Sequence, residues 1–245
     1  MVKQEIVQES CVIGIKGCQD FSFVDWHGKV SAVIFFSGCN MRCGYCHNHA
    51  IVRNPDSFHD ISYESILGKL ESMAGWVDGV VVSGGEPTLS PYLPEVLADI
   101  KERGFQTKLD TNGLRPDVLA DVISKGLVDC IAMDIKAPLC PFLYKKVVGV
   151  PVDLKKIRES LSILMEGTVD YQIRATLAPG LLINDYKRLI VELEGVKHLT
   201  LQKFRPGDIM NPALNDMETL SDEDIKELLL FAADYVEKAA VSRHE

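Results

Sequence analysis

The chain has 245 residues, 47% of them hydrophobic and 25% charged, which is the composition of a globular protein with one large or two small domains. Its 26 basic and 35 acidic side chains leave a net charge of −9, which disfavours sequence-independent binding to nucleic acid. Apolar runs such as 32–36 and 228–233 are too short to span a membrane, which takes about 20 residues, and the first ten residues lack the apolar core of a signal peptide. We therefore expect a cytoplasmic protein that binds neither nucleic acid nor a membrane.

Short apolar runs rich in Val and Ile alternate with amphipathic runs along the chain. The former are typical of buried parallel strands, and the latter, several of which begin near Pro and end before Gly, are typical of helices. In chain order we expect a strand at 30–36, helix 62–73, strand 79–82, helix 91–103, strand 106–109, helix 116–125, strand 130–133, helix 153–166, strand 171–177, helix 185–194, strand 198–202 and helix 221–240. Helices that connect successive strands predict a parallel sheet, either doubly wound or an open barrel.

Every predicted strand is followed by a loop that is polar or contains glycine. These loops lie at residues 38–46, 83–87, 110–113, 134–136, 178–180 and 203–208. In parallel α/β folds the functional site forms at the carboxyl ends of the strands. We therefore expect all six loops to face one cavity.

The first loop contains three cysteines, Cys39, Cys43 and Cys46, in a segment of eight residues. In a reducing compartment such a cluster favours metal binding over disulfides, and thiolates select zinc or an iron–sulfur cluster. Three thiolates suit a four-iron cluster with one iron left open, whereas zinc would need a fourth ligand. His47 or His49 would strain a tetrahedral zinc site, and the other cysteines, Cys11, Cys18, Cys130 and Cys140, form no second motif of this kind.

The pattern of Cys39, Cys43, Tyr45 and Cys46 after the first strand, with a Gly-Gly-Glu loop at 84–86 after the second, resembles the signature of the radical S-adenosylmethionine (radical SAM) superfamily. The resemblance covers nearly the whole chain. It implies an α/β fold, a partial (β/α)6 barrel with parallel strands and the helices outside. It also implies a single domain over residues 1–245, with an N-terminal extension at 1–29 and a C-terminal helix at 221–240.

Within that superfamily, residues 46–48, 110–113 and 134–136 resemble the activating enzymes of glycyl radical enzymes. Residues 15–29 are most similar to the branch that activates anaerobic ribonucleoside-triphosphate reductase, which is similar to the pyruvate formate-lyase activating enzymes. The resemblance implies that a [4Fe-4S] cluster cleaves S-adenosylmethionine reductively, and that the resulting 5′-deoxyadenosyl radical generates a glycyl radical on the partner enzyme. A flavodoxin- or ferredoxin-type protein would supply the electron.

The same resemblance implies a role for each motif residue. The cluster ligands would be Cys39, Cys43 and Cys46, which are therefore also the catalytic residues. The contacts to S-adenosylmethionine would come from Tyr45, His47, Gly84, Gly85, Glu86, Asp110, Asn112, Asp134, Lys136 and Arg174. Arg205 stands where the pyruvate formate-lyase activating enzymes have a histidine, and it would contact either the cofactor or the partner protein.

Several of these residues also have simpler interpretations. Residues 110–113 could form an ordinary Asn-Gly turn, and Asp134 and Lys136 could be a surface ion pair. Arg174 lies inside a predicted strand, where a charge needs a partner, and the candidates are Asp134, Glu86 or the methionyl carboxylate of the cofactor.

Two further functions compete with the activating enzyme. One is a radical enzyme that acts on a small molecule such as a deazapurine, and the other is a non-enzymatic binding module stabilised by a structural zinc ion. Pyruvate formate-lyase or another glycyl radical enzyme is the alternative protein substrate.

Overall fold

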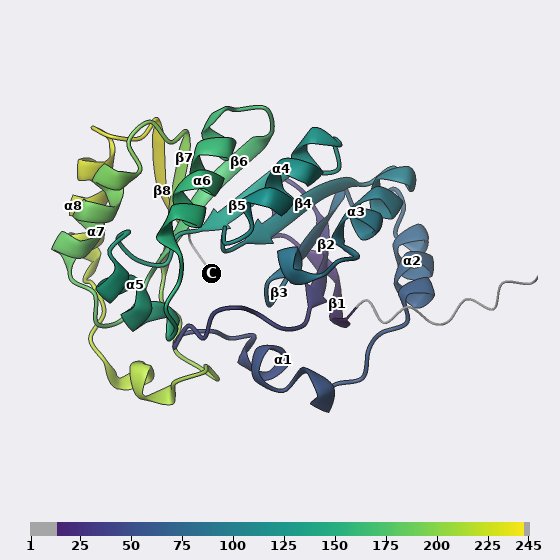
Figure 1. The fold of residues 1–245 in the computed structure, drawn as a ribbon, viewed down its shortest axis with the longest axis horizontal. Coiled ribbons are helices and arrows are strands. Elements are labelled where there is room, and N and C mark those ends of the chain that lie inside the picture. The colour runs from purple at the N-terminus through teal and green to yellow at the C-terminus, as the bar shows by residue number, and fades with distance from the viewer. Residues whose placement is uncertain (1–13, 243–245) are drawn as a thin grey trace, which may run out of the picture.

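The computed structural model describes residues 14–242, and its eight strands form one sheet (Figure 1). In chain order the strands are β1 (Ile15–Ser22), β2 (Ser31–Phe36), β3 (Gly79–Gly84), β4 (Gln106–Thr111), β5 (Cys130–Asp134), β6 (Asp170–Leu177), β7 (His198–Lys203) and β8 (Lys238–Ser242). The order in the sheet is the order in the chain. β1 is antiparallel to β2, and all other neighbours are parallel.

Helices connect the parallel strands, and most of them cover the outside of the curved sheet, whereas α1 lies apart from it (Figure 1). They are α1 (His49–Arg53), α2 (Tyr63–Ser72), α3 (Leu93–Glu102), α4 (Pro116–Ser124), α5 (Pro141–Val148), α6 (Leu154–Met165), α7 (Ile183–Glu192) and α8 (Asp222–Ala232). The side chains of Ser62, Asp153 and Ser221 cap the first turns of α2, α6 and α8. Short 3-10 turns occur at Pro55–Ser57, Pro87–Leu89 and Pro212–Asp216.

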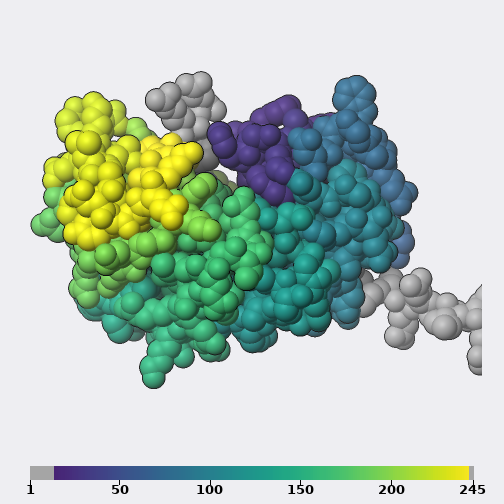
Figure 2. All heavy atoms as spheres, turned by 90° about the horizontal axis from the view of Figure 1, so that it is seen from above, coloured from purple at the N-terminus to yellow at the C-terminus, as the bar shows by residue number. Residues whose placement is uncertain are grey.

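The sheet is strongly curved but open. Figure 2 shows the N-terminal segment (purple) and the C-terminal segment (yellow) on the same face of the molecule. Within residues 14–242, β1 and β8 are the two edges of the sheet and do not pair with each other. This is the partial barrel that the sequence predicts. The six predicted strands are confirmed as β2 to β7.

The sequence prediction is wrong at the two edges of the sheet. The predicted helix at 221–240 ends at Ala232, and residues 238–242 form β8 instead, parallel to β7. The chain reverses at 233–237, where Tyr235 O accepts from Gly195 N and Glu237 N donates to Val196 O. The expected N-terminal extension contains a strand, β1, that the sequence analysis did not predict. Cys11 lies outside the described residues.

The two faces of the sheet have different side chains because neighbouring residues of a strand point to opposite sides. On the outer face, Ile34 and Val82 belong to the main core beneath the helices. On the inner face, Trp26, which follows β1, packs against Val33, Val81 and Cys130 and fills one end of the barrel interior. The other end of the interior, at the carboxyl ends of the strands, is polar and hollow. Among residues 14–242, no helix is long and apolar enough to cross a bilayer.

Candidate active site

A cavity of about 380 Å³ lies at the carboxyl ends of β2 to β7. That volume is within the usual range for small-molecule sites. Every site residue that the sequence singled out lines it: Cys39, Cys43, Tyr45, Cys46, His47, Gly84, Gly85, Glu86, Asp110, Asn112, Asp134, Lys136, Arg174 and Arg205. The expectation that the loops after the strands face one cavity is confirmed for the loops after β2 to β5 and after β7.

The cysteine loop leaves β2 and is fixed by backbone hydrogen bonds to distant parts of the chain. Gly38 N donates to Ile51 O at 3.0 Å, and Arg42 N donates to Val148 O at 2.8 Å. Met210 N donates to Cys46 O at 3.1 Å. The three thiols are therefore presented by a loop that is held from three directions.

The thiols are largely buried, and this burial raises the pKa of Cys39 and Cys43 to about 11. Without metal these groups are neutral thiols at pH 7, so metal binding must displace their protons. In residues 14–242, no three Cys, His, Asp or Glu side chains lie close enough together to ligate one metal ion. A single zinc ion needs such convergence, whereas a four-iron cluster takes its thiolates on different irons. The loop fits the cluster better than it fits zinc.

Tyr45 offers a further polar group to this region. Its side chain lines the cavity, and its hydroxyl is buried with no hydrogen-bond partner among the described residues. Burial raises the pKa of this hydroxyl well above its usual value, so it remains protonated. Buried hydroxyls usually have partners, so the orphaned Tyr45 group is consistent with a site built for a bound molecule.

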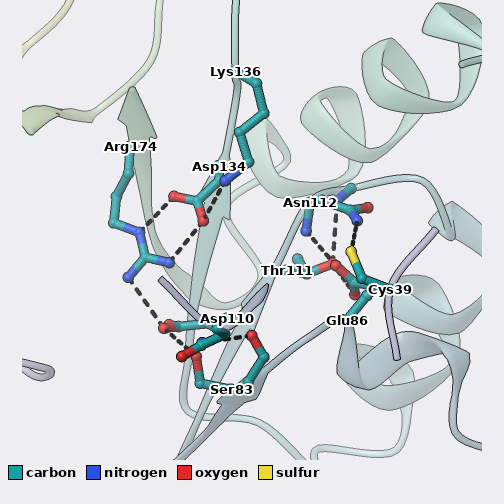
Figure 3. A network of polar contacts seen from close by, with 12 residues as sticks. Cys39, Ser83, Glu86, Asp110, Thr111, Asn112, Asp134, Lys136 and Arg174 are labelled. Atoms are coloured by element: carbon teal, nitrogen blue, oxygen red, sulfur yellow. Dashed lines mark hydrogen bonds and ion pairs between the residues drawn. The ribbon is translucent and has the colours of Figure 1, made fainter. Parts of the chain in front are cut away.

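Glu86 holds the ends of β3 and β4 together. Its carboxylate accepts from Thr88 N, from the Thr88 hydroxyl, from Thr111 Oγ1 at 2.8 Å and from Asn112 N at 2.7 Å (Figure 3). Burial raises the pKa of Glu86, while these hydrogen bonds oppose that shift. Its oxygens are occupied by the protein, so this side chain positions the loop and leaves ligand contacts to the neighbouring backbone.

The two glycines of this loop are required by close backbone approach. A Cβ on Gly85 would lie 1.8 Å from Gly38 O, and Gly84 has φ +112° with its ideal Cβ 2.4 Å from Phe36 O. Gly84 O accepts from Asn48 Nδ2 at 2.8 Å. The glycines thus bring the 84–86 backbone directly against the cysteine loop.

Gly85→Ala is therefore expected to lower the free energy of unfolding by about 1–3 kcal/mol, as overpacking does, and to reduce iron retention after reconstitution. Urea unfolding and iron analysis measure both effects. Gly68→Ala is the matched control, because Gly68 lies inside α2 with nothing within 4 Å of the added Cβ. That change should raise stability by about 0.5–1 kcal/mol. Equal behaviour of the two variants would contradict the packing argument.

A row of alternating charges, formed by Lys136, Asp134, Arg174 and Asp110, lines the cavity (Figure 3), and Lys108 extends the row from Asp110. Arg174 in β6 donates to Asp134 at 2.8 and 3.1 Å and to Asp110 at 3.1 Å. Lys136 Nζ lies 3.0 Å from Asp134, and Lys108 Nζ lies 2.9 Å from Asp110. Arg174 therefore pairs with Asp134, one of the predicted partners, and with Asp110, but not with Glu86.

The cations control the ionisation of both carboxylates. Burial alone would raise the pKa of Asp134, but Arg174 and Lys136 hold it well below its usual range. The pKa of Asp110 is likewise lowered by Arg174 and Lys108 despite burial. Burial would lower the pKa of Lys136, yet Asp134 raises it. Asp110, Asp134, Lys136 and Arg174 are therefore all charged at neutral pH.

Lys108, which pairs with Asp110 but does not itself line the cavity, is a residue that the sequence analysis missed. It is 1% exposed, and its ammonium group bonds to the Asp25 carbonyl at 2.6 Å as well as to Asp110. A lysine two residues before the aspartate, on the same face of a strand, was the available signal. Ser83 Oγ also donates to Asp110 at 3.1 Å.

Comparison with known proteins gives three relatives. A protein of Methanocaldococcus jannaschii, named provisionally as a glycyl-radical enzyme activating enzyme, is 29% identical over 93% of this chain and 95% of its own length. A pyruvate formate-lyase-activating enzyme of Clostridium pasteurianum is 33% identical over 50% of this chain and 52% of its own. A 7-carboxy-7-deazaguanine synthase of Methanopyrus kandleri is 31% identical over 45% and 51%, respectively. The chain thus spans about half the length of the latter two.

Among solved structures, Streptococcus suis SuiB bound to its precursor peptide SuiA superposes with a TM-score of 0.65. The match covers 86% of this chain and 48% of that protein, and at 16% identity it shows a shared fold alone. The family model described as the Radical SAM superfamily matches residues 33–193, which include the cysteine loop, the diglycine loop and the charged row. This chain belongs to the radical SAM superfamily, whose cofactors are a [4Fe-4S] cluster and S-adenosylmethionine.

Proposed function

We propose that this protein activates a glycyl radical enzyme by removing a hydrogen atom from a glycine Cα of that partner. The observation that carries the proposal is the similarity to the M. jannaschii protein, which extends over 93% of this chain. The match to the deazaguanine synthase, which favours a small-molecule substrate, covers 45% of the chain. We further propose that residues 1–245 form a single domain of a cytoplasmic protein.

The three thiols of Cys39, Cys43 and Cys46 would hold the cluster. Together the bound cluster and S-adenosylmethionine supply a one-electron cleavage that produces a carbon-centred hydrogen abstractor. Lys136 and Arg174 would attract the methionyl carboxylate, and the carbonyls of 84–85 would accept from its ammonium group.

The remaining predicted contacts are assigned by their places around the cavity. The Asp134 carboxylate and its neighbour Asp110 would orient ribose hydroxyls and the two cations. Tyr45 and His47 would flank the adenine from the cysteine loop. Asn112 Nδ2 donates to Asn40 Oδ1 at 2.7 Å and lies 3.9 Å from Cys39 Sγ, so it would support the loop beside the cofactor.

One side of the cavity is left for the substrate. Thr176, Gln202 and Arg205 line it from β6, β7 and the loop that follows, and within residues 14–242 their side chains have no hydrogen-bond partner. In contrast, the charged row is already paired. Unpaired donors and acceptors suit a peptide backbone, so we place the glycine-bearing loop of the partner on this side.

The preferred partner is anaerobic ribonucleoside-triphosphate reductase. This choice rests on the resemblance of residues 15–29, which form β1 and the turn into β2. Pyruvate formate-lyase is the second candidate.

The test is anaerobic incubation of the reconstituted, reduced protein with S-adenosylmethionine and each candidate enzyme. We expect an EPR doublet from a glycyl radical on the reductase, together with 5′-deoxyadenosine. A glycyl radical that forms on pyruvate formate-lyase and not on the reductase would identify pyruvate formate-lyase as the partner. Cofactor turnover that modifies a deazapurine precursor, with no radical on either protein, would overturn the activating function.

A further inference from the structure

The cysteine loop has a second hollow on its other side. A depression of about 180 Å³ is lined by Gly44 and Tyr45 of the loop and by residues of α5, of the 178–181 segment and of the 211–217 segment. Tyr45 lines both the depression and the main cavity. Gly44 and Tyr45 lie between Cys43 and Cys46, so one layer of backbone separates the depression from the cysteines.

Helix α5 supports this outer side of the loop directly. Arg42 N donates to Val148 O at 2.8 Å, and Gly44 N donates to Val147 O at 3.4 Å. Figure 1 shows α5 next to the loop. The sequence analysis did not predict this helix, and the function proposed above uses none of its exposed side chains.

The exposed surface around the depression combines apolar and basic side chains. Phe142 on α5 is 76% exposed, and Met217 at the opposite lip is 44% exposed. Lys145 and Lys146 are exposed on the last turn of α5, and Lys146 lines the depression itself, where its Nζ donates to Gly180 O at 2.7 Å. With Arg42, whose guanidinium bonds to Cys39 O and Met41 O, they place three cations beside the loop.

These three cations gather here although the net charge of the chain is −9. Asp216 and Glu218, exposed on either side of Met217, are the acidic groups at the opposite lip. Lysines in the last turn of a helix also interact favourably with the helix dipole, so a purely structural role is the alternative. That role would affect stability and leave protein association unchanged.

We infer that the face formed by Arg42, Phe142, Lys145 and Lys146 around this depression is the docking surface for an acidic one-electron carrier protein. Radical SAM chemistry consumes one electron for each cofactor cleaved, and the cofactor and substrate occupy the inner side of the loop. An electron therefore enters from the outer side. In the transfer the carrier loses one electron and the bound cluster gains it, with no bond made or broken.

A basic surface on one protein that faces an acidic surface on the other is the usual arrangement for transient electron-transfer partners. An apolar centre seats the carrier, and basic side chains attract its acidic surface and speed the encounter at low salt. The inference rests on the superfamily chemistry and is independent of which glycyl radical enzyme is activated.

The test compares K145E/K146E with the wild-type holoprotein, using reduced flavodoxin and reduced ferredoxin as probes. Stopped-flow absorbance at low ionic strength follows reduction of the cluster. We expect the variant to be reduced about tenfold more slowly by a carrier, with the difference shrinking as salt screens the charges. Dithionite should reduce both proteins equally fast and support equal 5′-deoxyadenosine formation.

K69E/K125E is the matched control, because it reverses two exposed lysines on α2 and at the end of α4, away from α5. It should be reduced at the wild-type rate. D216N/E218Q, which removes negative charge from the opposite lip, should be reduced faster. K145R/K146R keeps the charge and should restore the wild-type rate.

Carbodiimide cross-linking gives a readout independent of activity. Lys145 and Lys146 should join to carboxylates of the carrier, and the peptides can be identified by mass spectrometry. Unchanged carrier-dependent reduction of K145E/K146E, or cross-links from these lysines to the glycyl radical enzyme in place of the carrier, would overturn the inference. Failure of the proposed function appears differently, as a missing glycyl radical with normal cluster reduction.

Discussion

Cys39→Ala is expected to abolish cofactor cleavage completely. The loop supplies three thiols, and losing one leaves two ligands for a cluster that needs three from the protein. Iron and sulfide should fall from about four of each per chain toward zero, and no 5′-deoxyadenosine should form on reduction. Because Cys39 is only partly exposed at the cavity wall and its thiol is neutral without metal, the metal-free fold should persist.

The measurements are iron and sulfide analysis, EPR of the reduced protein and far-UV circular dichroism. Cys140→Ala is the control, because Cys140 immediately precedes α5 and lies outside the cavity. That variant should retain a full cluster and normal cleavage. Stoichiometric zinc without sulfide in the wild-type protein would instead support the binding module stabilised by zinc, and it would contradict the prediction of an iron–sulfur cluster.

The centre of the fold could be predicted from sequence because its strands are buried on both faces. Runs such as 30–36 and 79–82 are nearly continuous stretches of apolar residues, and this pattern has few other interpretations. The edges could not be predicted in the same way. β1 contains Lys16, Gln19 and Asp20 and is interrupted by irregular register with β2. β8 is a short stretch with two alanines that continues an amphipathic helix in sequence, and only pairing with β7 makes it a strand.

Most residues of the site could also be predicted, but from the spacing of motifs and not from hydrophobic pattern. Motif spacing identified the residues around the cavity, but hydrogen bonding decides what each can do. The carboxylate of Glu86 is occupied by Thr88, Thr111 and Asn112, which sequence cannot show. Lys108 was overlooked because a lysine in an alternating strand is usually solvated, whereas here it is buried and bonded to Asp110 and to the Asp25 carbonyl.

Arg174→Met should have the second largest effect, because Arg174 is the one cation that bridges both carboxylates in the charged row. Removing one partner of a buried ion pair leaves charge uncompensated and costs about 3–5 kcal/mol. Lys108 and Lys136 still pair with Asp110 and Asp134, so we expect a loss near the lower limit, about 3 kcal/mol at pH 7. Binding of S-adenosylmethionine should weaken as well, since the floor of the cavity loses a positive charge.

The pH dependence of the free energy of unfolding shows whether lost ion pairing causes the destabilisation by Arg174→Met. In the wild-type protein the folded-state pKa values of Asp110 and Asp134 are lowered, so their contribution to stability is present above the unfolded value of about 3.9 and is lost as pH falls through the folded values. Without Arg174 both folded-state pKa values rise and this contribution shrinks. The stability difference between the two proteins should therefore be largest near pH 7 and narrow as pH falls below about 4, where the carboxylates begin to be protonated.

Urea unfolding of the cluster-free proteins at several pH values measures this difference. Arg188→Met provides the control, because Arg188 on α7 is 56% exposed and lies 3.6 Å from Glu192. Only the arginine of this i,i+4 pair is exposed, since Glu192 is 17% exposed, but at this separation a helix pair still contributes only about 0–1 kcal/mol, so the effect of the change should be small at every pH. If Arg174→Met lowers the free energy of unfolding by the same amount at about pH 3 as at pH 7, lost packing of its side chain would explain the effect, and the ion pairs of the charged row would contribute little to the stability of the fold.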